Sequence, residues 1–533
     1  MRKSVLSLVS LFAVSAFACG GAPDAPAPLQ ASDGGIAPSP TASGSGSTEL
    51  PDGGQVLPGR DPRPDADAGP TAVPPPPPTK PNEITEQFGV FVSPSGQSNA
   101  SGTRTAPLAS IEAAIERAKN ENKKKVFVCE GSYAETLTLA DGVSIEGRLD
   151  CSAPDWKLDE TKHVDLAAPS SPAIRATNIT SATRIDGFRV ASPDATTPSG
   201  SSIAVLAVDS NGLTFANGMI TAGNGMKGDD GVEGEQLRQE STASEARGAS
   251  EAIAACFWFG VRCTNANKWS RPGASGSSAR CLGVDGREVS RSRGGTGAST
   301  GAYYRVSFHD AWVMVIAPVP QEPGSGTGAD GGNGANGLEG SLSEQGYRPG
   351  DGTRGSSGEV GRGGDGAAVV GPNGFALGAD YWWGRLGGGG GAGGCQGLAG
   401  TPGKGGGASI GVLALRSPIQ IVDAVVTSAS GGQGGAGTLG SDPTPGLSTG
   451  ETQGVAGNAM NGSRGGVPGV SGHGAGGPSF AVAHSGASPI LTGTRASVGA
   501  GGEAAAEQRK VVLGVERVLP AGTKGEALDL KSF

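Results

Sequence analysis

Cysteine and histidine are the residues of this 533-residue chain best suited to chemistry, and it has seven of the first and four of the second. No two cysteines have the C-x₂-C spacing that structural zinc sites use, and the histidines are scattered. The sequence also has no phosphate-binding loop, no H-E-x-x-H motif and no Ser-His-Asp signature. We therefore expect no metal, no cofactor and no catalytic residue, and we expect the cysteines to form disulfides or to be modified.

Two short fragments point to glycosidic bond hydrolysis. Gly228-Asp229-Asp230 and Gly472-His473-Gly474 resemble the G-D-D and G-H-G pieces of polygalacturonases, which lie about one structural repeat apart in that family. Here they are far apart and their N-x-D and R-x-K partners are missing, so we interpret the likeness as chance. Residues 331–338 approximate a calcium-binding nonapeptide repeat, but Asn336 stands in place of aspartate and no tandem copy follows.

The N-terminus resembles the export signal of a bacterial lipoprotein. Two basic residues precede an apolar run over residues 5–17, which is too short to span a bilayer comfortably. The run ends in Ala16-Phe17-Ala18-Cys19, which resembles a lipobox. The resemblance implies that residues 1–18 are a signal peptide, that diacylglycerol is attached to the Cys19 thiol, and that Gly20 directs the protein to the outer membrane. Ordinary secretion, with the cysteine there by chance, is the alternative.

The composition is unusual for a packed globular protein. Of 533 residues, 96 are glycine and 37 are proline, and only 36% are hydrophobic, which is too little for dense apolar cores throughout. The net charge of −9 argues against nucleic acid as the main partner. Sixteen prolines lie between Pro23 and Pro81. We therefore expect residues 19–85 to be a disordered Pro/Ala/Gly-rich tether that reaches at most about 190 Å.

Folded structure is expected to begin near Phe88. Short alternating apolar runs predict strands, and residues 107–125 have one apolar face at helical spacing. Residues 88–160 contain S-P-S-G, then G-T-x-x-x-P-x-x-S-I-x-x-A-I, then V-F-V-C-x-G-x-Y-x-E. This order resembles the opening of pectate-lyase-like right-handed parallel β-helices, in which a helix caps the open end of stacked coils. The resemblance implies an all-β fold with an N-terminal capping helix.

Internal repeats support a stacked coil. Residues 202–208 and 409–415 share the pattern S-I-x-V-L-A, and residues 479–483 are a weaker copy. Continuing at the same offset places residues 212–215 over residues 419–422. Repeats of this kind bury a shared face by stacking.

The same coil would bring Cys129 and Cys151 together, because the 22 residues that separate them are about one coil. We expect a disulfide between them, worth roughly 3 kcal/mol by loop entropy. The other disulfide candidates allow three pairings and are Cys256, Cys263, Cys281 and Cys395.

Glycine is periodic after residue 220. It recurs at every third position in several runs, the longest from Gly388 to Gly406. A period of three is that of polyproline-II-like helices, which make no internal hydrogen bonds but can bond laterally where glycine clears one edge. We expect packed polyglycine-II-like helices, with unstructured loops as the alternative. The composition resembles that of polymorphic glycine-rich-sequence (PGRS-like) surface proteins.

Residues 238–305 fit neither pattern. They carry ten basic and five acidic residues and the cluster Phe257-Trp258-Phe259. We favour a structurally loose insertion. Binding of an anionic polysaccharide, or a segment read in an altered frame, are the alternatives.

These features divide the chain into seven parts and predict its role. The parts are a signal peptide (1–18), the tether (19–85), an N-terminal β-helix part with its capping helix (86–222), a glycine-rich and basic insertion (223–407), a β-helix repeat (408–428), a glycine-rich insertion (429–477) and a C-terminal repeat and tail (478–533). We expect a non-enzymatic, lipid-anchored cell-envelope protein, periplasmic or at the cell surface, with a structural or adhesive role. Its partners would be the membrane, through the lipid, and envelope polysaccharides or proteins.

The alternative is a polysaccharide lyase or glycoside hydrolase on the same scaffold. That function requires Asp, Arg, Lys or His side chains that converge on one outward face of a sheet.

Overall fold

A computed structural model describes residues 71–241, 253–256, 278–292, 294, 326–364, 380–383, 390–448 and 461–533. The expected signal peptide, Cys19, most of the expected tether and Cys263 lie outside the described residues. For residues 253–256 and 380–383, only the backbone is described. The described part contains strands and one α-helix, which agrees with the expected all-β class.

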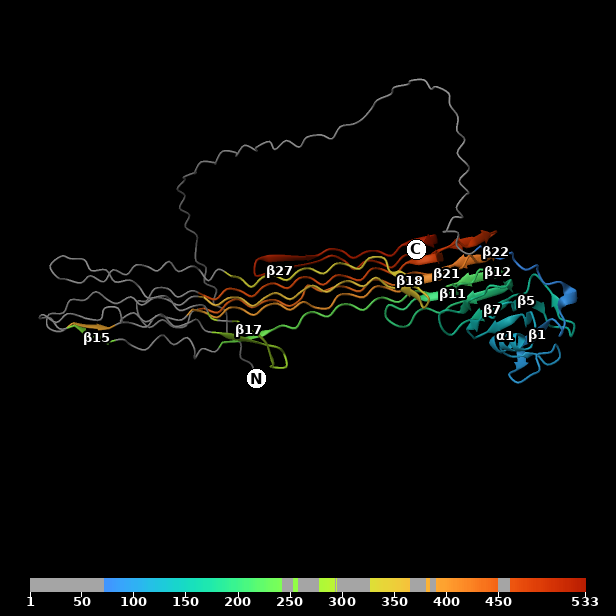
Figure 1. The fold of residues 1–533 in the computed structure, drawn as a ribbon, viewed down its shortest axis with the longest axis horizontal. Helices are drawn as coiled ribbons and strands as arrows, with labels where there is room; N and C mark the ends of the chain where they lie inside the picture. The colour runs from blue at the N-terminus through green and yellow to red at the C-terminus, as the bar shows by residue number, and fades with distance from the viewer. Residues whose placement is uncertain are drawn as a thin grey trace, which may run out of the picture. The chain divides into compact units, whose positions relative to one another are not determined.

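Three parallel sheets form the strand-rich part of the molecule (Figure 1). Sheet A contains β1 (Gly89–Gln97), β2 (Lys125–Cys129), β5 (Ser144–Asp150), β9 (Thr183–Asp186), β12 (Leu213–Ala216), β22 (Gln420–Val422) and β25 (Ile490–Thr492), with β6 (Lys157–Leu158) antiparallel to β5. Sheet B contains β3 (Gly131–Tyr133), β7 (Val164–Ala167), β10 (Phe188–Ala191), β13 (Met219–Thr221), β23 (Val425–Thr427) and β26 (Arg495–Ser497). Sheet C contains β4 (Leu137–Thr138), β8 (Ile174–Thr177), β11 (Ser202–Val208), β21 (Ser409–Leu415), β24 (Ser479–Ser485) and β29 (Ala527–Ser532).

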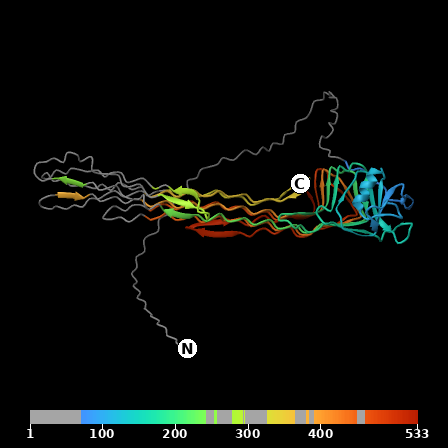
Figure 2. The same cartoon turned by 90° about the horizontal axis from the view of Figure 1, so that it is seen from below.

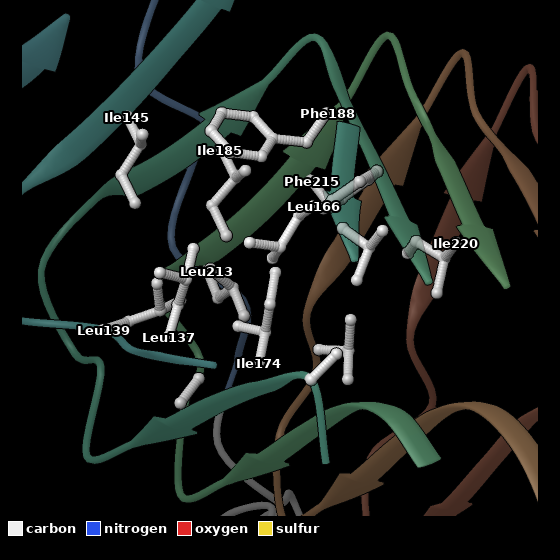
Figure 3. Close-up of a cluster of buried hydrophobic side chains, with 14 of the residues drawn as sticks. Leu137, Leu139, Ile145, Leu166, Ile174, Ile185, Phe188, Leu213, Phe215 and Ile220 are labelled. Atoms are coloured by element: carbon white, nitrogen blue, oxygen red, sulfur yellow. The ribbon is translucent and has the colours of Figure 1, made fainter. Parts of the chain in front are cut away.

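The chain visits sheets A, B and C in turn, and each pass places its strands beside those of the pass before. We call this arrangement the strand stack. Its interior holds one cluster of buried apolar side chains contributed by all three sheets. Figure 3 shows Ile145 and Ile185 from sheet A, Phe188 and Leu166 from sheet B, and Ile174 from sheet C directed toward one another. Because strands alternate their side chains, the residues between these face outward.

Helix α1 (Ile111–Asn120) covers the first pass of the stack, as expected from its apolar face. Its buried side chains are Ile111, Ala114, Ile115 and Ala118. The Ser110 hydroxyl accepts from Ala113 N, and the Glu135 carboxylate accepts from Ser110 Oγ at 2.6 Å and from Ile111 N at 2.7 Å. These acceptors satisfy N–H groups that the first turn leaves free, and the negative charge favours this end of the helix.

The internal repeats pair as neighbouring strands. Ser202 lies opposite Ser409 and Ser409 lies opposite Ser479, in the register that the repeats predict. The predicted alignment of the residues that follow is wrong by one position, since Thr214 lies opposite Gln420. The corner that precedes β22 is one residue shorter than the corner before the matching residue of β12, so a constant offset does not hold through it.

Residues 71–84 lie along the outer face of sheet A, although the tether was expected to extend to residue 85. We call them the strap. Gln420 Nε2 on β22 donates to Val73 O, and Lys125 Nζ on β2 donates to Thr79 Oγ1 at 2.9 Å. The strap includes a 3₁₀ turn, η1 (Pro81–Glu83), and ends with the buried Ile84.

The length of the strap matches the width of the sheet that it crosses. From β22 to β2 there are four strand steps, about 19 Å at ~4.8 Å each. Six residues of polyproline II helix, the conformation favoured by the five prolines at 74–78, also span about 19 Å at ~3.1 Å each. The proline run therefore has the length that is needed to connect Val73, bound at β22, to Thr79, bound at β2.

The glycine-rich segments leave the stack after strands of sheet B and return to strands of sheet C. They run side by side in both views (Figures 1 and 2), and we call them the glycine bundle. Its six main segments are residues 223–237, 326–340, 350–364, 390–407, 429–448 and 461–478.

Backbone hydrogen bonds between neighbouring segments hold the bundle together. The 461–478 segment donates N–H groups to segments 429–448 and 350–364, and its carbonyls accept from segments 390–407 and 326–340, all at 2.7–3.1 Å. The backbone N–H and C=O groups of this segment have no partners within it, and four neighbouring segments supply their hydrogen-bond partners. Much of this segment is buried, although eight of its eighteen residues are glycine.

Glycine is required in the bundle because there is no space for a Cβ atom. A Cβ at Gly474 would lie 1.9 Å from Lys404 O, and one at Gly465 would lie 2.0 Å from Cys395 O. The colliding atoms are backbone atoms of a neighbouring segment, so no rotamer change relieves the clash. The three-residue period therefore reflects close approach of backbones.

Small antiparallel sheets complete the described structure. They are β14 (Arg238–Ser241) with β16 (Ala279–Leu282) and β17 (Glu288–Ser292), β15 (Ile253–Cys256) with β20 (Asp380–Trp383), β18 (Ser341–Ser343) with β19 (Gly346–Arg348), and β27 (Gln508–Val512) with β28 (Val515–Leu519). The β18–β19 hairpin packs Tyr347 and Leu342 on the outer face of sheet C.

Candidate functional site

Three long segments of the chain begin and end at the same end of the glycine bundle. They are residues 242–325, 365–389 and 449–460, most of which lie outside the described residues. The described residues that flank them are joined to one another: Gln239 Nε2 to Gly393 O (3.0 Å), Ser463 N to Arg362 O (2.9 Å), Ser463 Oγ to Gly326 O (2.6 Å), Leu447 N to Ala392 O (2.8 Å) and Gly462 N to Leu447 O (3.0 Å). We call this the loop end of the bundle.

The segments that start at the loop end hold an unusual share of the aromatic side chains. The chain has six tryptophans and five tyrosines. Five of the tryptophans and three of the tyrosines fall in these segments: Trp258, Trp269, Trp312, Trp382, Trp383, Tyr303, Tyr304 and Tyr381. Tryptophan, tyrosine and arginine dominate binding hot spots at protein interfaces. The strand stack, which needs aromatic residues for its core, has fewer of them.

Two contacts attach the first of these segments, residues 242–325, to the glycine bundle. Strands β14, β16 and β17 form one sheet, and Cys281 on β16 is joined to Cys395 in the bundle. Both cysteines are fully buried beside Leu237. Ser290 Oγ also donates to Gln396 Oε1 at 2.7 Å. Residues 278–292 are therefore fixed to the bundle, which corrects the expectation of a loose insertion over this part of 238–305.

A backbone strand pair connects two of the segments. Strand β15, in the 242–325 segment, pairs with β20, in the 365–389 segment, with Cys256 opposite Asp380 and Ile253 opposite Trp383. Of the four cysteines whose pairing was left open, Cys281 and Cys395 are joined to each other. The backbone of Cys256 lies in this strand pair. Cys263 lies outside the described residues.

A cluster of charged side chains lies on the outward face of sheet A, where sequence reasoning named no residue. Glu146 and Arg148 on β5 alternate with the inward-facing Ile145, and Arg184 and Asp186 on β9 flank the inward-facing Ile185. Alternating charged and apolar residues in two strands carry the signal for this cluster, but only the in-register pairing of Glu146 with Asp186 brings the two carboxylates together.

The charges in this cluster neutralise one another. Asp186 accepts from Arg184 Nε at 2.6 Å and from Asn217 Nδ2 at 2.9 Å, and its distance to Arg148 Nε is 2.9 Å. Glu146 is only 2% exposed and lies 3.6 Å from Arg148 Nε. Burial, together with the nearby Asp186 charge, raises the pKa of Glu146 above its usual range.

The strap covers this cluster. Lys125 on the neighbouring strand donates to both Thr79 and Glu83 of the strap, and the Thr79 hydroxyl partly offsets the rise in the pKa of Glu146. The cluster therefore has the residue types of an acid–base site, but these residues are paired and shielded from solvent.

The polygalacturonase-like fragments lie on different segments of the bundle. Asp230 accepts from Lys227 Nζ at 2.8 Å and from Ala436 N at 2.7 Å, and the Lys227 contact lowers the pKa of Asp230. His473 is fully buried and its Nδ1 accepts from Gly437 N at 2.8 Å. Burial lowers the pKa of His473. The two side chains therefore bind adjacent N–H groups of the segment between them.

The calcium-like repeat also serves the packing of the bundle. Three residues spaced by three, Asp330, Asn333 and Asn336, accept from backbone N–H groups of the 461–478 segment at 2.8, 3.1 and 2.9 Å. Each acceptor is therefore used by a neighbouring segment. Sequence reasoning missed this row of acceptors. Its signal is an Asp or Asn directly before each of three glycines that recur at every third position.

The expected disulfide between Cys129 and Cys151 is present and lies under the end of the strap. Its cysteines pack with Ile84, Phe91 and Trp156 on the outer face of sheet A. The disulfide therefore joins the end of β2 to the residue that follows β5, and the end of the strap packs against it.

Within the described residues, no three His, Cys, Asp or Glu side chains are grouped closely enough to hold a metal ion. In the same part of the chain, no helix has the length and hydropathy that crossing a membrane requires. Comparison with protein-family models, with curated protein sequences and with solved structures gives no significant match to this chain.

Proposed function

We propose that this chain is a non-enzymatic, lipid-anchored cell-envelope protein that binds envelope polysaccharides or proteins through the loop end of its glycine bundle. The strand stack is, in this proposal, a right-handed parallel β-helix with α1 as its cap. The bundle is a set of polyglycine-II helices inserted between sheets B and C. The observation that carries the proposal is the convergence of three segments at one end of the bundle, two of which hold eight of the chain's eleven tryptophans and tyrosines.

The construction of the bundle supports a display role. Its segments are cross-linked by backbone hydrogen bonds along their length, and a buried disulfide fixes the first displayed segment. A scaffold of this kind holds several loops at fixed positions, which lowers the entropy lost on binding. Binding residues concentrate on loops that a rigid scaffold positions.

Binding through the loop end is tested with the purified, fluorescently labelled chain on isolated envelopes and on an array of envelope polysaccharides. We expect the wild-type chain to bind and the Trp382→Ala/Trp383→Ala variant to lose about tenfold or more in affinity, as hot-spot aromatics do. The matched control is Val511→Ala/Leu513→Ala, which removes exposed apolar side chains from the β27–β28 hairpin. Equal binding by the tryptophan variant, or no binding by the wild type, would contradict the proposal.

The anchor is tested separately by labelling with palmitate. In the proposal, the Cys19 thiol receives diacylglycerol and residues 1–18 are removed, so the wild type is labelled and fractionates with the outer membrane. The Cys19→Ala variant should carry no label. Equal labelling of the two proteins would reject the anchor and favour ordinary secretion.

A second candidate function is polysaccharide cleavage on the outer face of sheet A. The Glu146, Arg148, Arg184 and Asp186 cluster is the observation that favours it. Its shielding by the strap and the mutual pairing of its charges favour the binding proposal instead. Release of unsaturated or reducing products from a panel of polyuronates by the wild type, and its loss in Glu146→Gln, would establish the enzyme.

A further inference from the structure

The two ends of the strand stack differ. At the first end, α1 buries Ile111, Ala114 and Ile115 against the interior cluster. At the last end, among the described residues, β25, β26 and β29 each pair with a strand on one side only. All residues of β25 and β26 are exposed, whereas the preceding strands β22 and β23 are largely covered.

The apolar interior continues into this last pass and ends there. Leu491 lies in register with the interior residue Ile421, and Leu530 lies in register with the interior residue Val482. Leu491 is 40% exposed and Leu530 is 43% exposed. Exposed apolar residues beside unpaired strand edges are typical of an interaction surface.

We propose that this end of the stack, formed by β25, β26 and β29, binds a second copy of the chain about a two-fold axis. The inference does not depend on the proposed function, since it rests on the last pass of the stack alone. At the other end α1 packs against β1 and β4, so that end does not offer free strand edges in all three sheets to match β25, β26 and β29 in a head-to-tail stack, and a closed dimer is the favoured arrangement.

The strand lengths fit such an axis. A two-fold axis that passes through the middle of sheet C and through the corner between sheets A and B pairs β25 of one copy with β26 of the other, antiparallel. Both strands have three residues. Leu491 then lies opposite Ala496 of the second copy, and both face inward, since Ala496 is in register with the interior residue Val426. A large residue meets a small one on the same face, as good packing requires.

The same axis pairs β29 with itself. A register centred on Leu530 places Leu530 opposite its own counterpart, and it places Asp529 of each copy beside Lys531 of the other. No ion pair or side-chain hydrogen bond joins Asp529 to another described residue of its own chain, whereas Lys531 is bound by Glu339 and Glu526. The complementary charges give this pairing a preference over other registers.

The glycine bundles do not obstruct this dimer. In each copy the bundle leaves the stack at the corner between sheets B and C, because its segments follow β13, β23 and β26 and precede strands of sheet C. The two-fold axis exchanges sheets A and B, so the bundle of the second copy leaves at the opposite edge of sheet C. The dimer therefore carries two glycine bundles, one beyond each edge of sheet C.

Cysteine cross-linking of the full chain tests the proposal. In the Leu530→Cys variant the two introduced thiols lie opposite each other across an antiparallel pair, within ~5.5 Å between Cβ atoms, so mild oxidation should join them. We expect a species of twice the chain mass on a non-reducing gel, and mass spectrometry should identify a peptide pair in which both halves contain residue 530. The control is Val284→Cys, which is 86% exposed on a turn of the described structure and should cross-link only by random collision.

A charge variant tests the register. Adding Asp529→Lys to Leu530→Cys places like charges beside Lys531 of the second copy, and the dimer yield should fall several-fold. Adding Asp285→Lys instead makes the same change in net charge at an exposed turn and should leave the yield unchanged. A yield for Leu530→Cys no higher than for Val284→Cys, or a cross-link to a different protein, would overturn the proposal.

Discussion

At the scale of single residues, glycine contributes space in this molecule more than conformational freedom. Among the described glycines of the bundle segments, only Gly440 has a positive φ, of 73°. The others adopt backbone angles open to any residue, yet a side chain at most of them would enter the backbone of a neighbouring segment. This distinction predicts that glycines of the bundle differ greatly from one another in their tolerance to substitution.

Gly472 and Gly332 form a matched pair for this prediction. A Cβ atom at Gly472 would lie 1.9 Å from Ala335 O, whereas a Cβ atom at Gly332 meets nothing closer than Ser356 Oγ at 3.7 Å. We expect Gly472→Ala to destabilise the chain by about 1–3 kcal/mol through overpacking. Gly332→Ala should be neutral or stabilising by up to about 1 kcal/mol. Denaturant unfolding measures both, and similar values for the two variants would be inconsistent with the packing.

His473 predicts a pH dependence of stability. Its pKa is lowered by burial, so the folded chain keeps the ring neutral below the pH at which the unfolded chain protonates it, about 6.5. The contribution of His473 to stability is therefore complete above pH ~6.5 and is lost as the pH falls toward the lowered pKa. In His473→Asn the amide oxygen can still accept from Gly437 N, and the variant should lose less stability than the wild type between pH 7.5 and 5.5. Parallel pH profiles for the two proteins would refute this role of the histidine.

At the scale of elements, the sequence is most informative where side chains are buried. The apolar face of α1 and the repeated S-I-x-V-L-A pattern predicted a helix and the register of three strands, because these elements are selected by the burial of particular apolar side chains. The period of three likewise predicted extended glycine segments. Which segment pairs with which was not predictable from glycine alone, since backbone groups are identical. Partner choice is set by side chains such as Asn333, which accepts from Val470 N.

The strap and the charged cluster show a second limit of sequence reasoning. Proline-rich composition predicted disorder through residue 85, but Val73, Thr79 and Ile84 find partners that belong to strands far along the chain. Composition predicts whether a segment is ordered by itself. The strap is ordered by contacts with Gln420 and Lys125, which composition does not reveal. The charges on β5 and β9 were visible in the sequence, but their convergence required the register.

The strap should depend on Lys125. This side chain binds Thr79 Oγ1 at 2.9 Å and the Glu83 carboxylate at 2.5 Å. We expect Lys125→Ala to release this part of the strap and to expose the Glu83–Ile84 bond to a glutamate-specific protease. Lys157→Ala, which removes a lysine whose one ion pair among the described residues is with the exposed Asp155, is the control and should leave the bond protected. Protection in both variants would show that the proline run holds the strap by itself.

The disulfide between Cys281 and Cys395 should stabilise the hairpin of β16 and β17 locally. It closes a span of 114 residues, for which loop entropy alone gives about 4–5 kcal/mol. In the double serine variant, we expect the amides of residues 279–292 to lose most of their protection from hydrogen exchange. The amides of sheet C should keep theirs in the same measurement, because no part of that sheet depends on this bond. Unchanged protection of the hairpin would contradict this assignment.

At the scale of the whole molecule, two kinds of interior coexist in one chain. The strand stack buries apolar side chains from three sheets, whereas the glycine bundle buries backbone and relies on hydrogen bonds between segments. The low hydrophobic content of 36% follows from this division. The composition thus predicted that a conventional interior could not extend throughout, and the structure shows what replaces it.

This division should be visible in the heat capacity of unfolding. Exposure of apolar surface raises the heat capacity and exposure of polar surface lowers it, with a typical net gain of about 12–15 cal/mol/K per residue. Because unfolding of the bundle exposes mainly peptide groups, we expect a value per residue clearly below that range for the whole chain. Differential scanning calorimetry at several pH values gives the number, and a value within the usual range would indicate a larger apolar interior than the structure shows.

The strap has a mechanical consequence. It enters sheet A at Val73, beside β22, and ends at Ile84, beside β1, so tension on the chain before residue 71 loads its contacts one after another. Peeling requires far less force than shearing the same contacts together would. Complete release frees fourteen residues, about 45 Å of contour length, before the first strand of the stack bears load. In a chain held at its N-terminus, a brief pull would thus detach the strap, which can bind sheet A again afterwards. The strand stack would stay folded.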